Sequence, residues 1–529
     1  MDFQTGQTAE NLSGPFCCSR YEDLTMIVSG KNTFNVLDYG AAGDGQTLDT
    51  VALQAAIEAC SQAGGGTVYV PAGQYVTGSL FLRNHITLFL DAGATLLGSQ
   101  NTADYPPVAN RWEGVSRITH APLIGGEDLT HIAVVGRGTV DGRGAFWWEL
   151  GRRHALDYPR PRLISFSHCT NVLMEGITCT NSPSWTLHPY ACDNVTVDKV
   201  TIANPADSPN TDGINPESCR NVHIANCHID VGDDCITIKS GTEEEERGRL
   251  LPCENITITN CTMVHGHGGV VIGSEMSGGV RNITIANCVF VGTDRGIRLK
   301  SRRERGGIVE DIRVTNVVMT DVMCPFIMNL YYGCGAWGTD KITDRSPWPV
   351  NEGTPRFRRV HFSDITARDV RYAAAFLYGL PEMPVEDVAF SNVDISMALD
   401  AEPGVPAMAP DLEPMQRAGF WATNVRGLRF HNVTVADQLG PALLLADAAD
   451  VEINGFTTPT PSAGTPVIHM RNVAGAFVHG CQAAAGTDAF LRVEGEQTRD
   501  IVLSDNSLPR AARAVDRTAD VPVLAIEEK

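Results

Sequence analysis

Lysine is scarce in this chain of 529 residues, because six of its 41 basic residues are lysine and the other thirty-five are arginine. Long apolar runs are also missing: no window holds the 18 or so uninterrupted apolar residues typical of a membrane-crossing helix. The first thirty residues lack the apolar core of an export signal. The sequence therefore predicts a soluble protein, cytoplasmic as it stands, and secreted or periplasmic if a signal has been removed.

Cysteine spacings typical of metal sites are absent as well, since the sequence contains no CxxC pair and no Cys/His ligand pattern. The fifteen cysteines are an odd number, and Cys227, Cys261 and Cys288 stand where a small buried hydrophobic residue would serve. We expect mostly reduced, buried thiols, no metal and no cofactor.

Acidic residues outnumber basic ones, and the formal net charge is −21. This charge argues against nucleic acid or an anionic membrane as a partner. A polyanionic substrate would need a local cluster of cations to overcome the field of the whole protein. Arginine suits such a cluster because its forked donors match a carboxylate.

A short repeat dominates the middle of the chain, in which apolar residues alternate between two asparagines. Successive copies begin 23, 27, 34, 27 and 29 residues apart, at Asn171, Asn194, Asn221, Asn255, Asn282 and Asp311. Weaker copies follow at Val360, Val388, Leu428, Val451 and Ile501. This period leaves too few residues for crossover helices, so it predicts a coiled stack of parallel strands.

The predicted fold class is all-β, a parallel β-helix with an N-terminal capping helix. Residues 49–62 form the amphipathic helix, with Asp49 as its candidate cap, and the glycines 64–66 end it. Residues 1–33 are an extension, and 34–529 form one catalytic domain whose catalytic coils span about 163–335. A leucine-rich repeat lacks its Leu-x-x-Leu-x-Leu signature here, and a propeller would need a longer period. The proline-rich stretch 402–414 reads as an excursion from the stack.

Stacking converts sequence spacing into geometry, because residues one coil apart at the same strand position lie above one another. Asp212 precedes the pair Asp233 and Asp234 by about one coil. His267 follows one or two coils later, and Arg298 and Lys300 follow after that. The predicted result is a column of three carboxylates, one imidazole and two cations on one surface. The adjacent Asp233 and Asp234 can share that surface only if the strand bends between them.

Four motifs resemble those of glycoside hydrolase family 28, the polygalacturonases. They are Asn210-Thr211-Asp212, Asp233-Asp234, Gly266-His267-Gly268 and Arg298-Leu299-Lys300, where the family usually has Arg-Ile-Lys. Residues 38–41, 64–71, 136–142 and 181–185 also resemble the family's cap and first coils, so the resemblance covers about residues 33–335. It implies a right-handed parallel β-helix that cleaves α-1,4-galacturonosidic bonds.

The resemblance also assigns roles. It implies that Asp233 is the general acid, that Asp212 and Asp234 hold the attacking water, and that His267 tunes the acid's protonation. Arg298 and Lys300 would bind the carboxylate of the sugar, and Asn210 would join them in binding substrate. The chemistry is consistent, because three crowded carboxylates cannot all ionise at neutral pH and one keeps a proton. Room for a water between acid and base predicts inversion of configuration.

Several further residues are candidates for the cleft. Trp185 and His188, on the coil before Asp212, could support a sugar face, although a packed core tryptophan is the plainer interpretation. Arg295, Arg302, Arg303 and Arg305 could supply the local positive field or form a solvated turn. Tyr331 or Tyr332 could match the family's cleft tyrosine. The run Glu243 to Glu246 is expected to be an exposed loop, because it would repel a uronate.

Two other functions remain to be separated from hydrolysis. A pectate lyase on the same scaffold would use Ca²⁺ and an arginine base, and no calcium cluster is evident. A non-catalytic β-helical carbohydrate-binding protein, such as an adhesin or tailspike module, would keep the carboxylates for structure. Within the family, endo-polygalacturonase and rhamnogalacturonan hydrolase are the alternatives. The long connections 100–120, 143–160 and 335–356 could close one end of the cleft, which favours exo-action on a pectic polysaccharide or oligogalacturonate. The sequence leaves the oligomeric state open.

Overall fold

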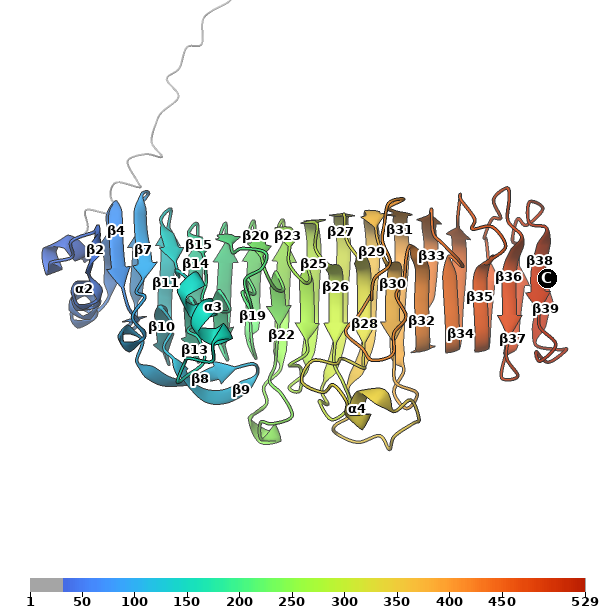
Figure 1. The fold of residues 1–529 in the computed structure, drawn as a ribbon, viewed down its shortest axis with the longest axis horizontal. Coiled ribbons are helices and arrows are strands. Elements are labelled where there is room, and N and C mark those ends of the chain that lie inside the picture. Colours follow the sequence, from blue (N-terminus) through green and yellow to red (C-terminus); the bar gives the residue numbers. More distant parts are fainter. Residues whose placement is uncertain (1–31, 529) are drawn as a thin grey trace, which may run out of the picture.

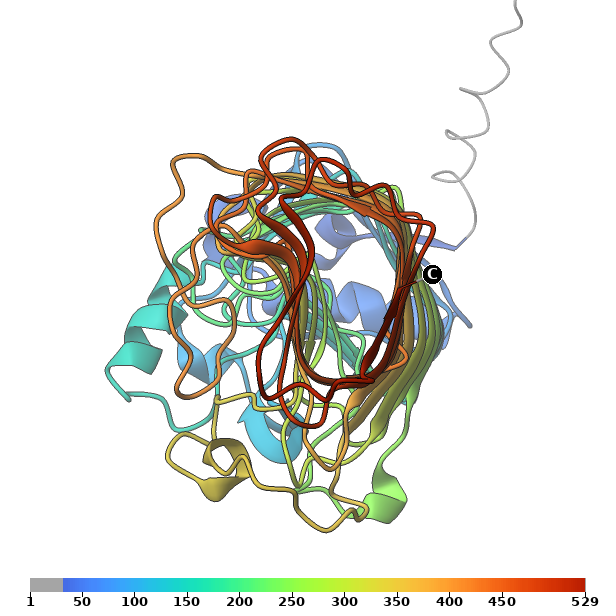
Figure 2. The same cartoon turned by 90° about the vertical axis from the view of Figure 1, so that its right-hand side faces the viewer.

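The protein is a right-handed parallel β-helix, described here over residues 32–528 of a computed structural model (Figure 1). The predicted extension 1–33 lies almost wholly outside the described residues. Viewed down the long axis, successive coils superpose around one elongated core, and most of the projecting loops gather on one side (Figure 2). The described residues contain no helix long and apolar enough to cross a membrane.

One face of the stack is a parallel sheet that forms the floor of the cleft described below. Its strands, joined in register by single bridges at Ile214 and Glu217, are β5 (Leu80–Phe81), β10 (Ile124–Glu127), β13 (Ile164–Ser167), β16 (Leu187–Tyr190), β21 (Ile236–Ile238), β24 (Val270–Gly273), β26 (Arg295–Lys300), β28 (Cys324–Asn329), β30 (Ala373–Tyr378), β32 (Ala418–Arg426), the first parts of β34 (Leu443–Thr457) and β35 (Pro466–His479), β36 (Ala489–Glu494) and β38 (Arg513–Arg517).

Two further faces complete each coil. The second face comprises β1 (Thr33–Asn35), β3 (Gly66–Val70), β6 (Ile86–Leu90), β11 (Thr130–Gly136), β14 (Thr170–Glu175), β17 (Asp193–Asp198), β19 (Arg220–Ala225) and β22 (Cys253–Thr259). The third comprises β2 (Asp44–Leu48), β4 (Gly73–Thr77), β7 (Ala94–Gly98), β12 (Thr139–Asp141), β15 (Thr178–Thr180), β18 (Thr201–Ala203), β20 (His228–Val231) and β23 (Thr262–His265). Later strands run on through the corner or close the stack: β25 (Val280–Val291), β27 (Ile308–Thr320), β29 (Arg356–Val370), β31 (Val385–Met397), β33 (Arg429–Ala436), β37 (Arg499–Ser504) and β39 (Ile526–Glu528).

The repeated asparagines turn the chain at the corners of the coil. Asn221, Asn255 and Asn282 all adopt positive φ, between 56° and 60°, a region that asparagine tolerates better than most residues. Their side chains also bond to one another from coil to coil, with Nδ2 to Oδ1 distances of 3.2 Å from Asn255 to Asn221 and 3.0 Å from Asn282 to Asn255. The repeat is thus explained by backbone geometry and by a ladder of amide hydrogen bonds.

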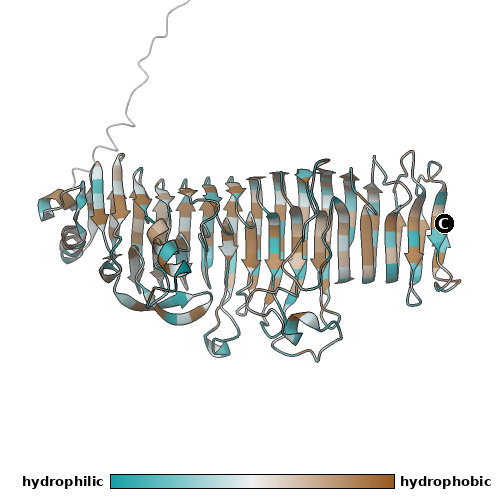
Figure 3. Cartoon of the chain, viewed as in Figure 1, coloured by the Kyte–Doolittle hydropathy of each residue, from teal (hydrophilic) through white to brown (hydrophobic). Residues whose placement is uncertain are grey.

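The core is a continuous column of apolar side chains. Between the asparagines, residues such as Ile256, Ile258, Ile283 and Ile285 point inward and are buried. Apolar colouring predominates along the strands of the stack (Figure 3). Cysteine belongs to this column, since twelve of the thirteen cysteines in the described residues are buried and all thirteen are free thiols.

A helix covers the N-terminal end of the core, as predicted. Helix α2 (Thr50–Gln62) buries Leu53, Ala56, Ile57 and Cys60. Asp49 stands at its N-cap position, but its carboxylate accepts hydrogen bonds from the backbone of Ala42 and Gly43 and not from the helix. The prediction of Asp49 as the cap was therefore right in position and wrong in its bond.

Loops and short elements project from the stack (Figure 1). They include the antiparallel hairpin of β8 (Pro107–Trp112) and β9 (Val115–His120), helices α3 (Ala145–Arg152) and α4 (Asp340–Thr343), and the short 3-10 turns η2 (Thr102–Asp104) and η3 (Arg247–Arg249). A further 3-10 turn, η1 (Val36–Tyr39), packs against α2 at the N-terminal end of the stack. The hairpin, the loop around η3 and the loop around α4 reach toward the same region of the cleft face.

Candidate active site

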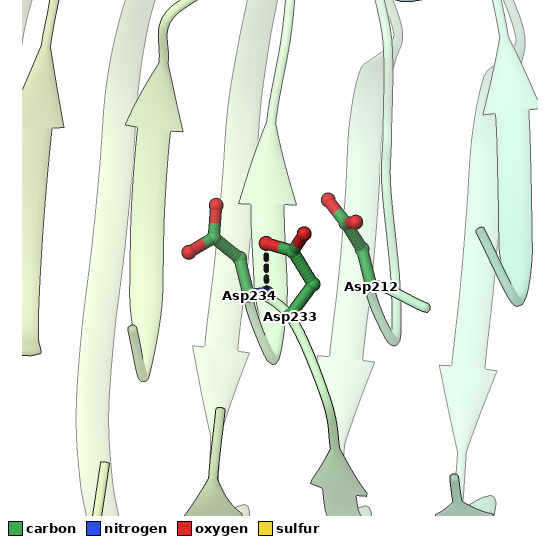
Figure 4. Close-up of side chains that lie close together, drawn as sticks. All are labelled: Asp212, Asp233 and Asp234. Carbon is green, nitrogen blue, oxygen red and sulfur yellow. Dashed lines mark hydrogen bonds between the residues drawn. The ribbon is translucent and has the colours of Figure 1, made fainter. Parts of the chain in front are cut away.

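Three aspartates from two successive coils meet on the cleft face (Figure 4). Asp212 follows β18, whereas Asp233 and Asp234 lie on the next coil, between β20 and β21. One oxygen from each carboxylate lies within 4.8 Å of the others. The spacing along the sequence thus placed these three residues correctly.

The chain bends at Gly232, as the adjacency of the two aspartates required. A Cβ at Gly232 would lie 2.6 Å from the carbonyl oxygens of Pro205 and Ser208, so only glycine fits. After the bend, the backbone N–H of Asp234 donates to Oδ1 of Asp233 at 2.9 Å. Both carboxylates consequently line the same cleft, with Asp233 the more exposed of the two.

Arg298 and Lys300 project from β26 toward Asp234, and the residues that alternate with them, Ile297 and Leu299, point into the core. Lys300 Nζ donates to Asp234 Oδ2 at 2.8 Å, and a guanidinium nitrogen of Arg298 lies 3.4 Å from Oδ1. Burial alone would raise the pKa of Asp234, but the two cations outweigh it and hold this pKa well below its usual range. Asp234 is therefore ionised at neutral and mildly acidic pH.

Asp212 lies in the opposite electrostatic situation. It is 3 % exposed, and its carboxylate accepts hydrogen bonds from Asn215 at 2.9 Å and Thr237 at 3.2 Å. Burial, reinforced by the charge of Asp233, raises the pKa of Asp212 to about 7. The cluster therefore retains one proton up to about neutral pH, and because its members interact, that proton belongs to the group.

His267 stands at the solvent side of the cluster. Its Nδ1 lies 3.3 Å from Oδ1 of Asp233, and this interaction raises the pKa of the imidazole. The ring lies beside the residue that resembles the family's acid, as the spacing predicted.

Of the remaining predicted substrate contacts, Trp185 and Asn210 line the cleft and His188 does not. Trp185 lines the cleft, stacked on Arg162 at 3.9 Å with Lys239 4.8 Å from its ring centre. Asn210 lines the cleft too, and its Oδ1 accepts a hydrogen bond from Arg160.

His188 requires a correction, because its ring is fully buried and is no part of the cleft lining. Its Nε2 lies 3.1 Å from Glu217, and its Nδ1 lies 3.3 Å from Ser165. Burial lowers the pKa of His188 to about 4, so the imidazole is neutral. The residue supports the sheet behind Trp185 and does not contact substrate.

Lys239 and its partner Glu275, which the sequence analysis missed, and the cleft tyrosine, which it left open between two residues, complete the site. Lys239 occupies the register position of Lys300 two strands earlier, its Nζ lies 2.8 Å from Glu275, and it contributes positive charge near Asp212 and Asp234. Tyr332, and not Tyr331, is the cleft tyrosine: Arg298 and Lys300 lie 5.6 Å and 5.3 Å from its ring centre, while Tyr331 is core. Lys239 stacks above the position of Lys300 on the same face of the sheet, and only the observed strand pairing shows this alignment.

The arginines near β26 do not form a solvated turn. Arg302 and Arg305 line the cleft, whereas Arg295 holds the carbonyls of Val405 and Pro406, and Arg303 binds Glu382. The acidic run also differs from its prediction as an exposed loop. Glu244 and Glu246 are exposed, but Glu243 pairs with Arg302 and Arg305, and Glu245 pairs with Arg111.

The cleft encloses about 390 Å³, at the small end of the range typical of ligand sites. Four loops contribute to its rim through Glu113, Glu244, Gly335 and Met408. The three aspartates are the one group among residues 32–528 with the spacing of a metal site. Because Lys300 and Arg298 already neutralise Asp234, a proton and a water suit the group better than a divalent cation.

The fold and this cluster define a class: a parallel β-helix with a site of three carboxylates suited to acid/base catalysis. The sequence model of glycosyl hydrolases family 28 matches residues 60–403. The chain belongs to this family, and it is a glycoside hydrolase.

Three relatives illustrate the similarity. The chain is 37 % identical to a probable polygalacturonase of Vitis vinifera over 74 % of this chain and 79 % of that protein. It is 30 % identical to an exo-poly-alpha-D-galacturonosidase of Dickeya chrysanthemi over 56 % of this chain and 57 % of that protein. The crystal structure of a hyperthermoactive exopolygalacturonase from Thermotoga maritima superposes with a TM-score of 0.65 at 30 % identity, covering 77 % of this chain and 92 % of that one.

Proposed function

We propose that the protein is a polygalacturonase, which hydrolyses α-1,4-galacturonosidic bonds of pectic polysaccharide or oligogalacturonates. The observation that carries this proposal is the convergence of Asp212, Asp233 and Asp234 beside Arg298 and Lys300 in one small cleft. Three carboxylates supply an acid and a base for glycoside hydrolysis, and the two cations suit the carboxylate of a uronic acid.

In this proposal Asp233 protonates the leaving oxygen, while Asp212 and Asp234 hold the attacking water. One oxygen from each carboxylate lies within 4.8 Å of the others, whereas the carboxyl groups of inverting enzymes are usually about 6.5–9.5 Å apart. A water that donates two ordinary hydrogen bonds bridges oxygens about 4.5 Å apart, so the cluster can still hold one. Inversion is therefore retained as part of the proposal, and proton NMR of the first-formed anomer tests it.

The proposed mode is exo. The rim loops that surround the small cleft support it, and so do the names of the Dickeya and Thermotoga relatives. The β8–β9 hairpin brings Glu113 to the rim, and Arg111 of the same hairpin binds Glu217 and Glu245 at 2.7 Å. An anchored wall of this kind would block a chain from running through the site.

Product analysis on unesterified oligogalacturonates tests both parts of the proposal. We expect monogalacturonate alone from the first time points, with new reducing ends and full activity in EDTA. A ladder of oligomers would indicate endo-action, and products that absorb in the ultraviolet would indicate a lyase. Binding without any cleavage would favour a carbohydrate-binding protein.

A further inference from the structure

The floor sheet is covered on both sides of the aspartate cluster, so the cleft is bounded along the axis of the stack. On the N-terminal side the cover is the β8–β9 hairpin. Its Arg111 lies over the ring of Tyr190 at 4.7 Å and binds Glu217 at 2.7 Å. These two floor residues pair with each other on successive coils, and Glu217 is fully buried. This is the wall that supports exo-action.

The C-terminal side has a second wall, formed by residues 402–414. This proline-rich segment leaves the stack between β31 and β32. Its two ends are joined by a pair of backbone hydrogen bonds between Gly404 and Met415, 2.8 and 2.9 Å long. The family model matches the chain only as far as residue 403, so nearly all of this wall lies beyond the matched region.

The segment covers the floor immediately past the cationic pair. The floor positions one and two coils beyond Arg298 are Ile327 and Phe376. Both would face a groove that continued along the sheet, yet they are 2 % and 0 % exposed. Ala407 of the segment belongs to the same buried apolar cluster. A sugar chain therefore cannot follow the sheet beyond Arg298.

Three side chains outside the segment hold it in place. They donate hydrogen bonds of 3.0 to 3.2 Å to its backbone carbonyl oxygens: Arg295 to Val405 and Pro406, Asn329 to Met408, and Arg345 to Pro410. Asn329 stands one coil past Lys300 and is 1 % exposed. The side chain of Met408 lines the cleft at this boundary. The wall is thus anchored to the floor next to the cationic pair.

The two walls leave a short length of open floor. It extends over the coils of Ile214, Ile236, Val270 and Ile297, which are three steps of about 4.8 Å or about 14 Å in all. Together with a cavity of about 390 Å³, this length leaves room for about two or three sugar residues. A longer chain would have to turn away from the sheet and lose contact with the floor.

We infer that the segment 402–414 is a specificity-determining wall that restricts the enzyme to short oligogalacturonates. The inference rests on the proposed function and narrows its substrate from polymer to oligomer. It also places the enzyme in a sequence of reactions, because another enzyme that cuts within the polymer must supply such oligomers.

Initial rates on substrates from digalacturonate to long polygalacturonate, expressed per chain end, test the inference. We expect kcat/KM for the long polymer to be at least about tenfold lower than for trigalacturonate, because the polymer loses contacts that the trimer makes. Equal values, or a preference for the polymer, would overturn the inference. If the enzyme cleaves no substrate of any length, the proposed function itself fails.

Removing the wall tests its role directly. Replacing residues 405–414 by Asn-Gly keeps the paired bonds of Gly404 and Met415, because a two-residue turn joins such a pair. The ratio of kcat/KM on polygalacturonate to that on trigalacturonate should rise at least about tenfold. Glu413→Gln, exposed on the same segment and outside the cleft lining, is the matched control and should keep the wild-type ratio.

An unchanged ratio in the folded deletion variant would show that the segment does not limit chain length. If circular dichroism shows that this variant is unfolded, the substrate series on the wild-type enzyme decides the question alone.

Discussion

Asp233 is the residue on which turnover should depend most. Replacing it by asparagine removes the proposed proton donor and leaves the shape of the cleft, so we expect kcat to fall by about 10²-fold to 10⁴-fold. Oligogalacturonate binding and the circular dichroism spectrum should change little. Isothermal titration and reducing-end assays measure the two effects.

The control for that substitution is Asp230→Asn, three residues earlier on β20, where the carboxylate pairs with His265 outside the cleft. It should keep its activity. A similar loss of binding and folding in both variants would show that Asp233 acts on structure and not on catalysis.

Asp212 links activity to pH. Its pKa of about 7 means that the cluster loses its last proton near neutrality, so kcat/KM should fall as pH rises through about 7. Titrating the rate against pH checks this. An alkaline limb that stays flat to pH 9 would contradict it.

The same shift predicts a gain in stability when Asp212 is removed. The folded pKa of about 7 exceeds the ordinary value of 3.8, so the folded protein binds more protons than the unfolded chain between these values and loses stability as pH rises through them. Asp212→Asn should therefore raise the free energy of unfolding at pH 8 by on the order of 3 kcal/mol and show little gain at pH 4, as measured by chemical denaturation. Equal differences at both pH values would sink this explanation.

At the scale of the element, the asparagine corners should contribute measurable stability. Asn255→Ala forces an alanine to φ 59° and removes ladder bonds to Asn221 and Asn282, so we expect a loss of about 2 kcal/mol in the free energy of unfolding. Asn255→Gly tolerates the conformation and loses only the bonds. Chemical denaturation of both variants separates the contribution of the positive φ from that of the hydrogen bonds. Equal losses in the two variants would mean that the positive φ does not destabilise the alanine variant.

The sequence predicted the repeating strands and most of the site residues that they position, but not the residues whose neighbours depend on strand register. The alternation around Asn221, Asn255 and Asn282 fixed the coil, and the coil placed Asp212, Asp233, Asp234, His267, Arg298 and Lys300 together. The prediction for His188 was wrong because the periodicity shows which side chains point out of the core, but not which other residues bury them. Lys239 and Glu275 were missed because their pairing depends on strand register across coils of unequal length.

Over the whole molecule, the buried thiols make a simple prediction. Twelve of the thirteen described cysteines are buried, and burial raises the pKa of Cys60, for example, to about 11. In a Cys17→Ser, Cys18→Ser background, Ellman's reagent should label about one thiol in the native protein and the rest only after unfolding.

Cys334 is the exposed one, and it lines the cleft. Cys334→Ser should abolish the native labelling, and oligogalacturonate should slow it in the parent. Fast labelling of several thiols in the folded protein would contradict a continuous, closed core.

Asp212 and the pair Asp233 and Asp234 come from neighbouring turns of one winding, whose strands are bonded in register at Ile214 and Ile236. The distance between successive turns is a constant of peptide hydrogen bonding, about 4.8 Å. Backbone hydrogen bonds between the coils therefore set how far the proposed proton donor, Asp233, lies from Asp212 on the neighbouring coil. Substitutions of the surrounding side chains can change the charge of the site. They cannot change the spacing between its two coils, because that spacing is the one found in every parallel sheet.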